Sequence, residues 1–304
     1  MAASRVKRLA AKFKKPLERK FEEYFRKVDD KPVGHGAFAT VWKVAPLEGV
    51  DFTPVMGTEA LPPLLAAKVI DKERIKPGEE VTLTREIEIM MTCRHENLLR
   101  LYDHFENDKE IVLITELMQG GELFKRVDNG ERVPEPETAR IIKSVVLGIA
   151  YLHEQNIAHR DLKPENILCG PNGEIKIADF GLSKSFDGEK LETTVGTLDY
   201  MAPEIVLQNV YDQSVDFWSI GVMTYALLSG TLPFYSTVSG VEMFRKIQAC
   251  EYSFDVGNAF RGVSGDAKDF IRRLIVRVPS ERMNKDQALN HPFLLTMGGS
   301  LPAP

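Results

Sequence analysis

The chain has 304 residues, of which 43% are hydrophobic and 27% charged, with a net charge of -5. That size and composition suit one large globular domain or two moderate ones. No uninterrupted apolar run approaches the roughly 18 residues that a membrane-spanning helix needs, so a spanning segment is not expected. The cysteines Cys93, Cys169 and Cys250 are far apart, which argues against a disulfide framework or a zinc site and favours a reducing compartment, the cytoplasm or the nucleus.

The N-terminal segment is strongly basic. Residues 1–20 contain eight Lys or Arg residues against one acidic residue, Glu18. A solvated tail is the first interpretation, and an anionic membrane surface or a calmodulin-type partner are the alternatives that its apolar residues suggest. Pro16 argues against one continuous helix through the segment. No nucleic-acid partner is expected. The apolar residues concerned are Val6, Leu9, Phe13 and Leu17.

A glycine pair follows in "VGHGAFATV", residues 33–41. Gly34 and Gly36 have the spacing of a phosphate-binding loop, but Ala39 stands where a third glycine is usual. The next stretch, "FATVWKV", alternates β-branched and aromatic residues with others and predicts a strand, not the helix of a dinucleotide-binding unit. The sequence therefore predicts a loop between two strands, which is a nucleotide site, a remnant of one, or a simple turn.

The remaining pattern changes from strands to helices. Residues 45–63 are rich in Pro and Gly and predict a long inserted loop, after which "LLAAKVI" predicts a strand. Residues 81–92 predict one helix, with Leu83, Ile87 and Met90 or Met91 on a common face. Residues 97–106 and 110–118 predict two further strands, and after Gly120 and Gly121 the pattern is mostly helical.

Two motifs carry the chemistry: "HRDLKPENIL", residues 159–168, and "IKIADFG", residues 175–181. Taken singly, Asp161 would be a turn aspartate, Asn166 a loop amide and Asp179 a cap. Together, however, the two motifs resemble those of the eukaryotic protein kinases. The phosphoryl transfer that this resemblance implies needs acids, an amide and a lysine that converge on one place. In that chemistry Asp161 accepts the proton of the attacking hydroxyl, Lys163 stabilises charge on the migrating group, and Asn166 and Asp179 offer hard oxygen ligands to Mg²⁺.

In these motifs and their order, the sequence resembles the eukaryotic protein kinases over residues 22–294. The resemblance implies an α+β, bilobal fold, with a small β-rich N-lobe at 22–116, a hinge at 117–121 and a larger, mostly helical C-lobe at 122–294. Residues 1–21 would form a basic extension and residues 295–304 a tail. ATP and Mg²⁺ are the implied cofactors, bound between the lobes.

The resemblance also assigns individual residues. Asp161, Lys163 and Asn166 are the implied catalytic residues, and Asn166 and Asp179 the metal ligands. Lys68 matches the strand lysine that holds the α and β phosphates, and Glu86 the helix glutamate that pairs with it. Glu122 and Glu165 match positions that bind a basic residue upstream of the acceptor. The remaining nucleotide-site positions are Val33, Gly34, His35, Gly36, Ala37, Phe38, Ala39, Val41, Ala66, Glu116, Met118 and Leu168.

Further positions have architectural or regulatory counterparts. "APE", residues 202–204, closes the activation segment of the resembled family, and Arg282 matches the arginine that pairs with Glu204. Asp216 matches a buried structural aspartate. Arg160 would receive a phosphate on Thr193, with Thr194 as the competing acceptor.

Lys163 together with Thr197 resembles the serine/threonine-specific branch, and "GGELF" and "HPFL" resemble its calcium/calmodulin-dependent-kinase-like group. The expected function is phosphate transfer from ATP to Ser or Thr of protein substrates, with a basic residue favoured upstream of the acceptor. The alternative is a catalytically silent pseudokinase scaffold.

Overall fold

The structure is a computed structural model that describes residues 19–36, 39–52, 60–76, 79–123, 130–185, 197–235 and 239–296. The chain divides into two compact units, Met1–Gln119 and Gly120–Pro304. Among the described helices, none combines the length and the apolar character needed to cross a bilayer. Unit 1 contains the six-stranded β-sheet and unit 2 most of the described helices, as the bilobal fold expected from the sequence requires.

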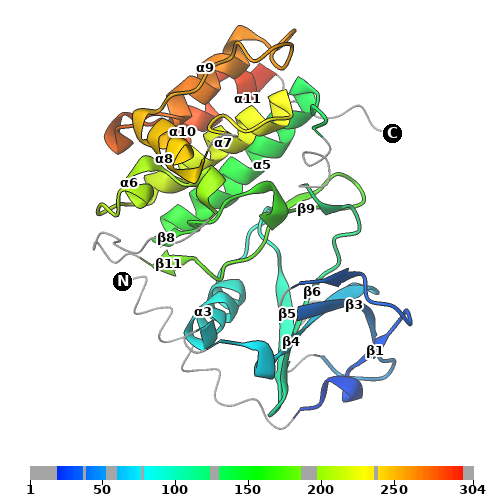
Figure 1. Cartoon of the computed structure of the whole chain (residues 1–304). Helices are drawn as coiled ribbons and strands as arrows, with labels where there is room; N and C mark the ends of the chain where they lie inside the picture. The colour runs from blue at the N-terminus through cyan, green and yellow to red at the C-terminus, as the bar shows by residue number, and fades with distance from the viewer. Residues whose placement is uncertain are drawn as a thin grey trace. The chain divides into compact units, whose positions relative to one another are not determined.

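Unit 1 is built around an antiparallel sheet whose strands run in the order β1-β3-β4-β6-β5, with β2 paired to β3 beside this path (Figure 1). Apolar side chains fill its core, among them Phe25, Val44, Leu65 and Ile114. The strands predicted around residues 40, 67, 101 and 113 are confirmed. Their bounds are β1 Phe25–Lys27, β2 Gly34–His35, β3 Ala39–Pro46, β4 Leu65–Asp71, β5 Leu101–Glu106 and β6 Glu110–Glu116.

The prediction of an inserted loop at residues 45–63 is wrong for its first residues. Strand β3 continues to Pro46 because β1 pairs with it there, in the register Phe25 to Pro46 and Arg26 to Ala45. Further on, the Phe52 ring lies 5.4 Å from the Phe25 ring, centroid to centroid. The described ends of the insertion therefore belong to the core of unit 1, whereas residues 53–59 lie outside the described part.

The basic N-terminal segment is also not solvated throughout. Arg19 donates two hydrogen bonds to the Asp103 carboxylate, at 2.5 and 3.2 Å, and its guanidinium lies 4.3 Å from the Tyr24 ring centroid. Although burial opposes it, the contact with Asp103 raises the pKa of Arg19. Phe21 stacks on Phe25 at 5.9 Å. Sequence periodicity could not show this anchor, because it joins residues 84 positions apart.

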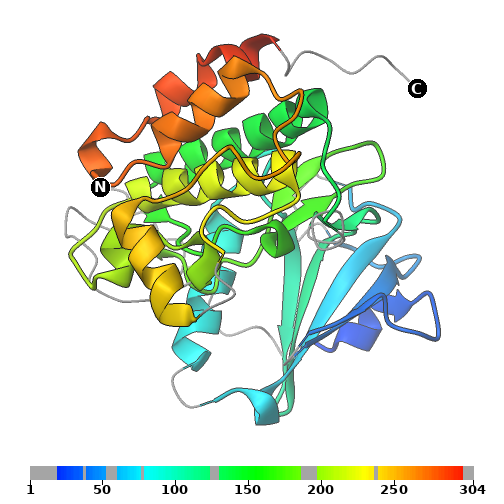
Figure 2. The ribbon, with the colours of Figure 1, turned by 45° about the horizontal axis from the view of Figure 1, so that its top comes forward.

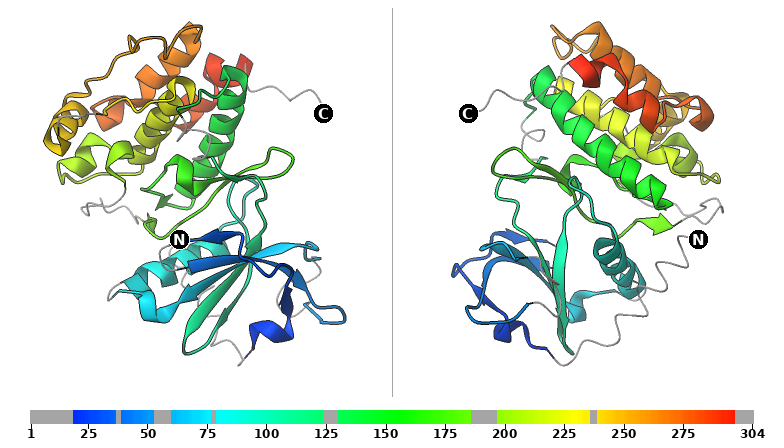
Figure 3. Two further views of the ribbon diagram at one scale, coloured as in Figure 1. Left: turned by 45° about the vertical axis from the view of Figure 1, so that its right-hand side comes forward. Right: turned by 180° about the vertical axis from the view of Figure 1, so that it is seen from behind.

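Helix α3, Glu79–Thr92, confirms the helix predicted at 81–92 and lies beside β5 in both views of Figure 3. Glu86, Ile89 and Met90 are buried, among the helix residues whose burial is described. Leu83 and Ile87, expected on the apolar face, are only half-buried. Helix α3 therefore places the Glu86 carboxylate in the interior of unit 1. The apolar side chains of Leu83 and Ile87 remain partly exposed.

Unit 2 is organised around two long helices that pack together, α5 (Glu135–Glu154) and α7 (Ser214–Ser229), with α9 (Gly265–Leu274) against α7 (Figure 2). Every residue of α7 is buried from Val215 onward, because its sequence is apolar on all sides. Shorter helices complete the unit: α6 Pro203–Val206, α8 Gly240–Ala249, α10 Lys285–Leu289 and α11 Pro292–Thr296. Its small strands are β7 Gly121–Glu122, β8 Ile157–Ala158, β9 Ile167–Cys169, β10 Ile175–Ile177 and β11 Lys184–Ser185.

Gly221 allows α7 to approach α9 closely. A Cβ atom at this position would lie 2.8 Å from the Leu274 Cβ and 2.9 Å from the Ile275 Cγ1. We expect Gly221→Ala to lower the free energy of unfolding by about 1–3 kcal/mol, because an overpacked core must shift backbone or side chains. Gly240→Ala is the matched control, since a Cβ there meets no atom within 4 Å. Urea unfolding of both variants checks this, and equal midpoints would contradict it.

Candidate active site

In unit 1 the structure brings together the lysine and the glutamate that the sequence singled out. Strand β4 carries Lys68 and helix α3 carries Glu86, and the Lys68 Nζ lies 3.2 Å from the Glu86 Oε1. The Glu86 side chain is only 9% exposed, whereas that of Lys68 is 35% exposed. The buried carboxylate therefore holds an ammonium group whose outer part stays accessible, as a phosphate ligand would require.

The described residues of the glycine loop join two paired strands, β2 and β3, as predicted. The Val33 N–H donates to the Val41 carbonyl at 2.8 Å, and the Gly36 N–H to the Ala39 carbonyl at 2.7 Å. A Cβ on Gly34 would come no closer than 3.9 Å to another atom, and one on Gly36 no closer than 3.6 Å. The chain's own packing therefore does not demand glycine here, and the space that the missing side chains leave fits the close approach of a phosphate.

The other predicted nucleotide-site residues divide between the two units. Ala39 is the first residue of β3 and pairs with Ile70, so the position of the absent third glycine already lies in the sheet. His35 pairs with Thr40, Ala66 is buried in β4, and Glu116 accepts the Arg100 N–H at 2.8 Å. Met118 belongs to unit 1, Leu168 is half-buried in β9 of unit 2, and Ala37 and Phe38 lie outside the described residues.

In unit 2, residues of the first motif, 159–168, form one hydrogen-bonded group around Asp161. The Lys163 Nζ lies 3.1 Å from the Asp161 Oδ2. The Asn166 Nδ2 donates to the Asp161 carbonyl at 2.8 Å and to its Oδ2 at 3.2 Å. With its nitrogen committed to Asp161, the carboxamide of Asn166 has its oxygen left as a ligand atom.

Thr197 completes this group, a role that the sequence did not assign to it. Its backbone N–H and its hydroxyl donate to the Asp161 Oδ1, at 2.9 and 3.0 Å, while its Oγ1 accepts from the Lys163 Nζ at 2.7 Å. Thr197 lies 36 residues after Asp161, so only its place shortly before "APE" could have indicated the contact. It joins the segment that ends in "APE" to Asp161 and Lys163.

The backbone at the start of the 159–168 motif is hydrogen-bonded to a buried carboxylate. Asp216, at the start of α7, accepts the N–H groups of His159 and Arg160 at 2.9 and 2.8 Å, and its Oδ2 lies 2.7 Å from the His153 Nε2. Burial alone would raise the pKa of Asp216, but the hydrogen bond and the charge of His153 hold it below the ordinary value. Arg160 itself has φ +71°, a left-handed backbone that needs such support.

A hairpin brings the two predicted metal ligands to the same place. Strands β9 and β10 are antiparallel with Ile167 opposite Ile177, so Asn166 before β9 and Asp179 after β10 lie at the same end. The Ala178 N–H donates to the Asn166 carbonyl at 2.8 Å. Asp179 is exposed and has φ +62°. An accessible carboxylate beside a carboxamide oxygen suits Mg²⁺, which takes hard oxygen ligands.

The two glutamates expected to meet a basic residue also lie near the loop. Glu122 is exposed on β7, which pairs with β9, opposite Leu168. Among the described residues, the Glu165 Oε2 is buried without a hydrogen-bond partner. Burial raises the pKa of Glu165, and the charges of Asp161 and Glu122 raise it further. A cation at this position would relieve both effects.

The architectural predictions are confirmed, whereas the regulatory one stays a prediction. Arg282 donates to the Glu204 carboxylate at 2.8 and 3.2 Å, and both side chains are buried. The Arg160 guanidinium donates to the Leu182 carbonyl at 2.6 Å and to the Tyr211 hydroxyl at 3.0 Å. Thr193 and Thr194 lie outside the described residues, so no described contact joins Arg160 to either threonine.

Comparison with known proteins agrees with this geometry. Residues 28–294 match the protein kinase domain family. The chain is 42% identical over 235 residues to a probable myosin light chain kinase of Dictyostelium discoideum, covering 76% of this chain and 59% of the relative. It is 39% identical over 265 residues to Aurora kinase C of Mus musculus, covering 87% and 90%.

A calcium/calmodulin-dependent protein kinase of Emericella nidulans is 41% identical over 237 residues, with 75% of this chain and 58% of the relative covered. The chain thus spans less than two thirds of the first myosin light chain kinase and of this relative. Residues 28–294, which match the family, include the Lys68–Glu86 ion pair of unit 1 and the group around Asp161 in unit 2. The chain therefore belongs to the protein kinase family, whose fold is bilobal and whose standard cofactors are ATP and Mg²⁺.

Proposed function

We propose that this chain transfers the terminal phosphoryl group of ATP to a Ser or Thr hydroxyl of protein substrates. The observation that carries the proposal is the arrangement of Asp161, Lys163 and Thr197, in which a carboxylate and an ammonium group share one threonine hydroxyl. A substrate hydroxyl presented to the same two groups would meet a proton acceptor and a positive charge together.

Each residue then has a distinct role. Asp161 orients the acceptor hydroxyl and accepts its proton at a carboxylate oxygen. Lys163 stabilises negative charge that develops on the transferred group. Asn166 and Asp179 would hold Mg²⁺, which when bound neutralises charge on the phosphates. Lys68, held by Glu86, would contact the non-transferred phosphates.

A pseudokinase scaffold is the alternative that the sequence left open. Such proteins usually lack one of the essential groups, but Lys68, Glu86, Asp161, Asn166 and Asp179 are all present here. Lys68 contacts Glu86, and Asn166 donates to Asp161. Asp179 is exposed, one residue after Ala178, whose N–H donates to the Asn166 carbonyl. The complete set supports catalysis, and nothing in the matches favours a silent scaffold.

The test is phosphate transfer from ATP with Mg²⁺ to a Ser peptide, with the same peptide carrying Ala at the acceptor as the control. Label should enter only the Ser peptide, and Asp161→Asn should reduce it to background. Equal incorporation by the intact chain and by Asp161→Asn would reject the catalytic proposal and return the chain to the scaffold reading.

We further propose that Glu165 and Glu122 select an Arg or Lys upstream of the acceptor. The support is the buried, unpartnered Glu165 Oε2 together with the exposed carboxylate of Glu122. A guanidinium satisfies such an oxygen by a charge-assisted hydrogen bond. Replacing the basic residue of the peptide by Ala should therefore raise KM more than it lowers kcat.

This selection should depend on pH in a defined direction. The folded-state pKa of Glu165 is raised by burial above the ordinary value of about 4.3. Only the carboxylate attracts a cation, so kcat/KM for the Arg peptide should rise with pH through this raised pKa and level off above it. This rise of kcat/KM with pH should be absent for a peptide with Ala in place of Arg. It should also be absent in Glu165→Gln with either peptide. If Glu165→Gln shows the same rise, a group other than Glu165 causes it.

A calmodulin-type protein is a candidate partner for the basic N-terminal segment. The support is the segment's charge, its spaced apolar residues and the matches to relatives named for calcium/calmodulin dependence. Titration of the intact chain with calcium-loaded calmodulin tests it. Binding that survives deletion of residues 1–18 would reject the segment as the site.

A further inference from the structure

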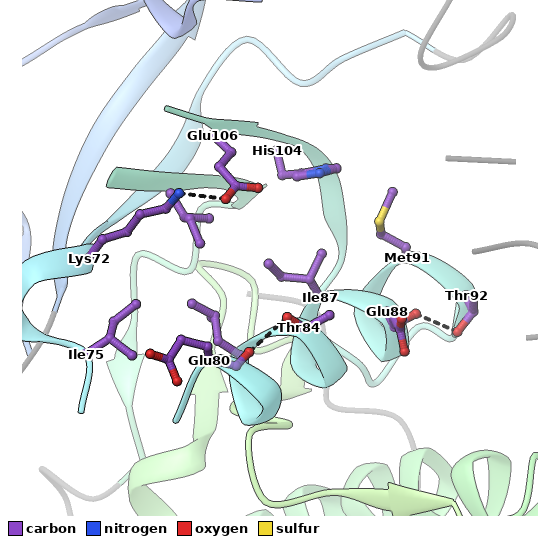
Figure 4. Close-up of a pocket in the computed structure, with 12 residues that line it drawn as sticks. Lys72, Ile75, Glu80, Thr84, Ile87, Glu88, Met91, Thr92, His104 and Glu106 are labelled. Carbon is purple, nitrogen blue, oxygen red and sulfur yellow. Dashed lines mark hydrogen bonds and ion pairs between the residues drawn. The ribbon is translucent and has the colours of Figure 1, made fainter. Parts of the chain in front are cut away.

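The residues of the candidate site differ between the two units in how closely they are enclosed. In unit 1, helix α3 carries Glu86, and its apolar residues Ile87 and Met91 border an open pocket of about 480 Å³ beside β5 (Figure 4). In unit 2, Arg160, which precedes Asp161, is only 6% exposed. A buried guanidinium is stable only where acceptors satisfy its donors, so the partners of Arg160 determine where its side chain lies.

Three groups of unit 2 hold Arg160. Its Nε donates to the Leu182 carbonyl at 2.6 Å, and its Nη1 donates to the Tyr211 hydroxyl at 3.0 Å. Its backbone N–H donates to the Asp216 Oδ1 at 2.8 Å. Tyr211 is itself buried and lies five residues before Asp216. Arg160 has φ +71°, a conformation that a residue with a side chain keeps only where its surroundings hold it. These contacts therefore fix the backbone from which Asp161 follows.

The guanidinium of Arg160 also reaches the segment after the second motif. Leu182, whose carbonyl accepts from it, lies three residues after Asp179. One buried cation thus links the residue before Asp161 to the backbone beyond Asp179, and the Tyr211 hydroxyl holds that cation from a third segment. The position of this single hydroxyl bears on both parts of the site.

We propose that Tyr211 is a positioning residue, whose hydroxyl holds the Arg160 guanidinium and, through it, Asp161 in the geometry that phosphoryl transfer needs. This inference rests on the proposed function, in which Asp161 accepts the proton of the acceptor hydroxyl. Tyr211→Phe keeps the ring and its packing but removes an acceptor from a buried donor, so the guanidinium must shift toward another acceptor. A displacement of about 1 Å away from the chemistry can cost on the order of a hundredfold in rate.

The first test compares Tyr211→Phe with the unchanged chain in the Ser-peptide assay, after phosphatase treatment of both so that their phosphorylation does not differ. The kcat should fall about tenfold, while the KM for the peptide stays within about twofold, because the hydroxyl acts on Asp161 and not on peptide binding. An equal kcat would overturn this inference alone. An unchanged chain without any activity would reject the proposed function instead.

Tyr225→Phe is the matched control. It removes another hydroxyl of a buried tyrosine in unit 2, one that donates to the Ser253 carbonyl at 2.7 Å. Its kcat should equal that of the unchanged chain, whatever its effect on thermal unfolding. If both tyrosine variants lose kcat to the same extent, the loss reflects general destabilisation and the positioning role is rejected.

A double-mutant cycle shows whether the hydroxyl acts through Arg160. Arg160→Met keeps a long side chain but offers no donor to the hydroxyl. Adding Tyr211→Phe to Arg160→Met should lower kcat by less than about twofold, because the contact is already absent. A full tenfold fall in that background would show that Tyr211 acts by another route and would overturn the proposal.

Amide hydrogen exchange tests the same coupling without substrate or ATP, and so without catalysis. Residues 159–163 should exchange severalfold faster in Tyr211→Phe than in the unchanged chain, because local opening there costs less free energy. In Tyr225→Phe the exchange of 159–163 should be unchanged. Equal exchange of this segment in Tyr211→Phe and the unchanged chain would overturn the proposal, even if the chain transferred no phosphate.

Discussion

Asp161→Asn should lower kcat for peptide phosphorylation by about a thousandfold, because the variant loses a general base whose contribution is typically 10²–10⁴-fold. The amide is nearly the same size as the carboxylate, but it no longer attracts the Lys163 ammonium, which lies 3.1 Å away. The Asn side chain also has a nitrogen that donates hydrogen bonds. In the unchanged chain, the Asp161 carboxylate accepts hydrogen bonds from Thr197 and Asn166. Initial-rate kinetics with a Ser peptide checks the effect.

The control for this variant is Asp212→Asn, an exposed carboxylate that accepts the Ser214 N–H at 2.8 Å and can still do so as an amide. Its kcat should equal that of the unchanged chain. Thermal unfolding of both variants distinguishes lost chemistry from lost structure. More than a tenth of the original kcat in Asp161→Asn would show that another group accepts the proton.

Asp216→Asn should lower the free energy of unfolding by about 3–5 kcal/mol, since breaking a buried ionic group leaves its partners unsatisfied. The carboxylate accepts two backbone N–H groups and contacts the His153 ring, with no exposed surface. In the Asn variant, an amide nitrogen replaces one of these accepting oxygens, so a hydrogen-bond donor would lie opposite the donors that the carboxylate accepts from. The matched control is Asp269→Asn, whose carboxylate contacts the His291 Nε2 at 3.0 Å but is 43% exposed, so it should cost no more than about 1 kcal/mol.

The stability that Asp216 contributes also has a pH dependence. Its folded-state pKa is lowered below the ordinary Asp value of about 3.9. The contribution is therefore complete above that ordinary value and is lost as pH falls toward the lowered pKa. Urea unfolding between neutral and acidic pH should show a smaller loss for Asp216→Asn than for the unchanged chain. Parallel pH profiles would mean that Asp216 does not titrate in this range.

Local motifs allowed much of the site to be predicted. Asn166 and Asp179 are close because a short hairpin separates them, and Glu86 faces Lys68 because a regular helix follows the strand. In both cases the spacing along the sequence, together with regular secondary structure, determines where the two side chains lie. The glycine loop was recognised for the same reason, and its pairing with β3 explains why Ala39 is acceptable at the third position.

Contacts made by the folded chain over long sequence separations could not be predicted. Thr197 meets Asp161 only after the activation segment returns to the loop, and Arg19 meets Asp103 across most of unit 1. The burial of one Glu165 oxygen depends on tertiary packing. Composition reveals a charge, but its partner depends on the tertiary structure.

The β9–β10 hairpin has a practical consequence for engineering this protein. Its open end carries Asn166 and Asp179, while the turn at 170–174 closes the opposite end, where the Gly170 N–H donates to the Glu174 carbonyl at 2.8 Å. Residues inserted at that turn lengthen the loop without moving the paired register of Ile167 and Ile177. The turn is therefore a suitable attachment point for a reporter group that leaves Asn166 and Asp179 in place.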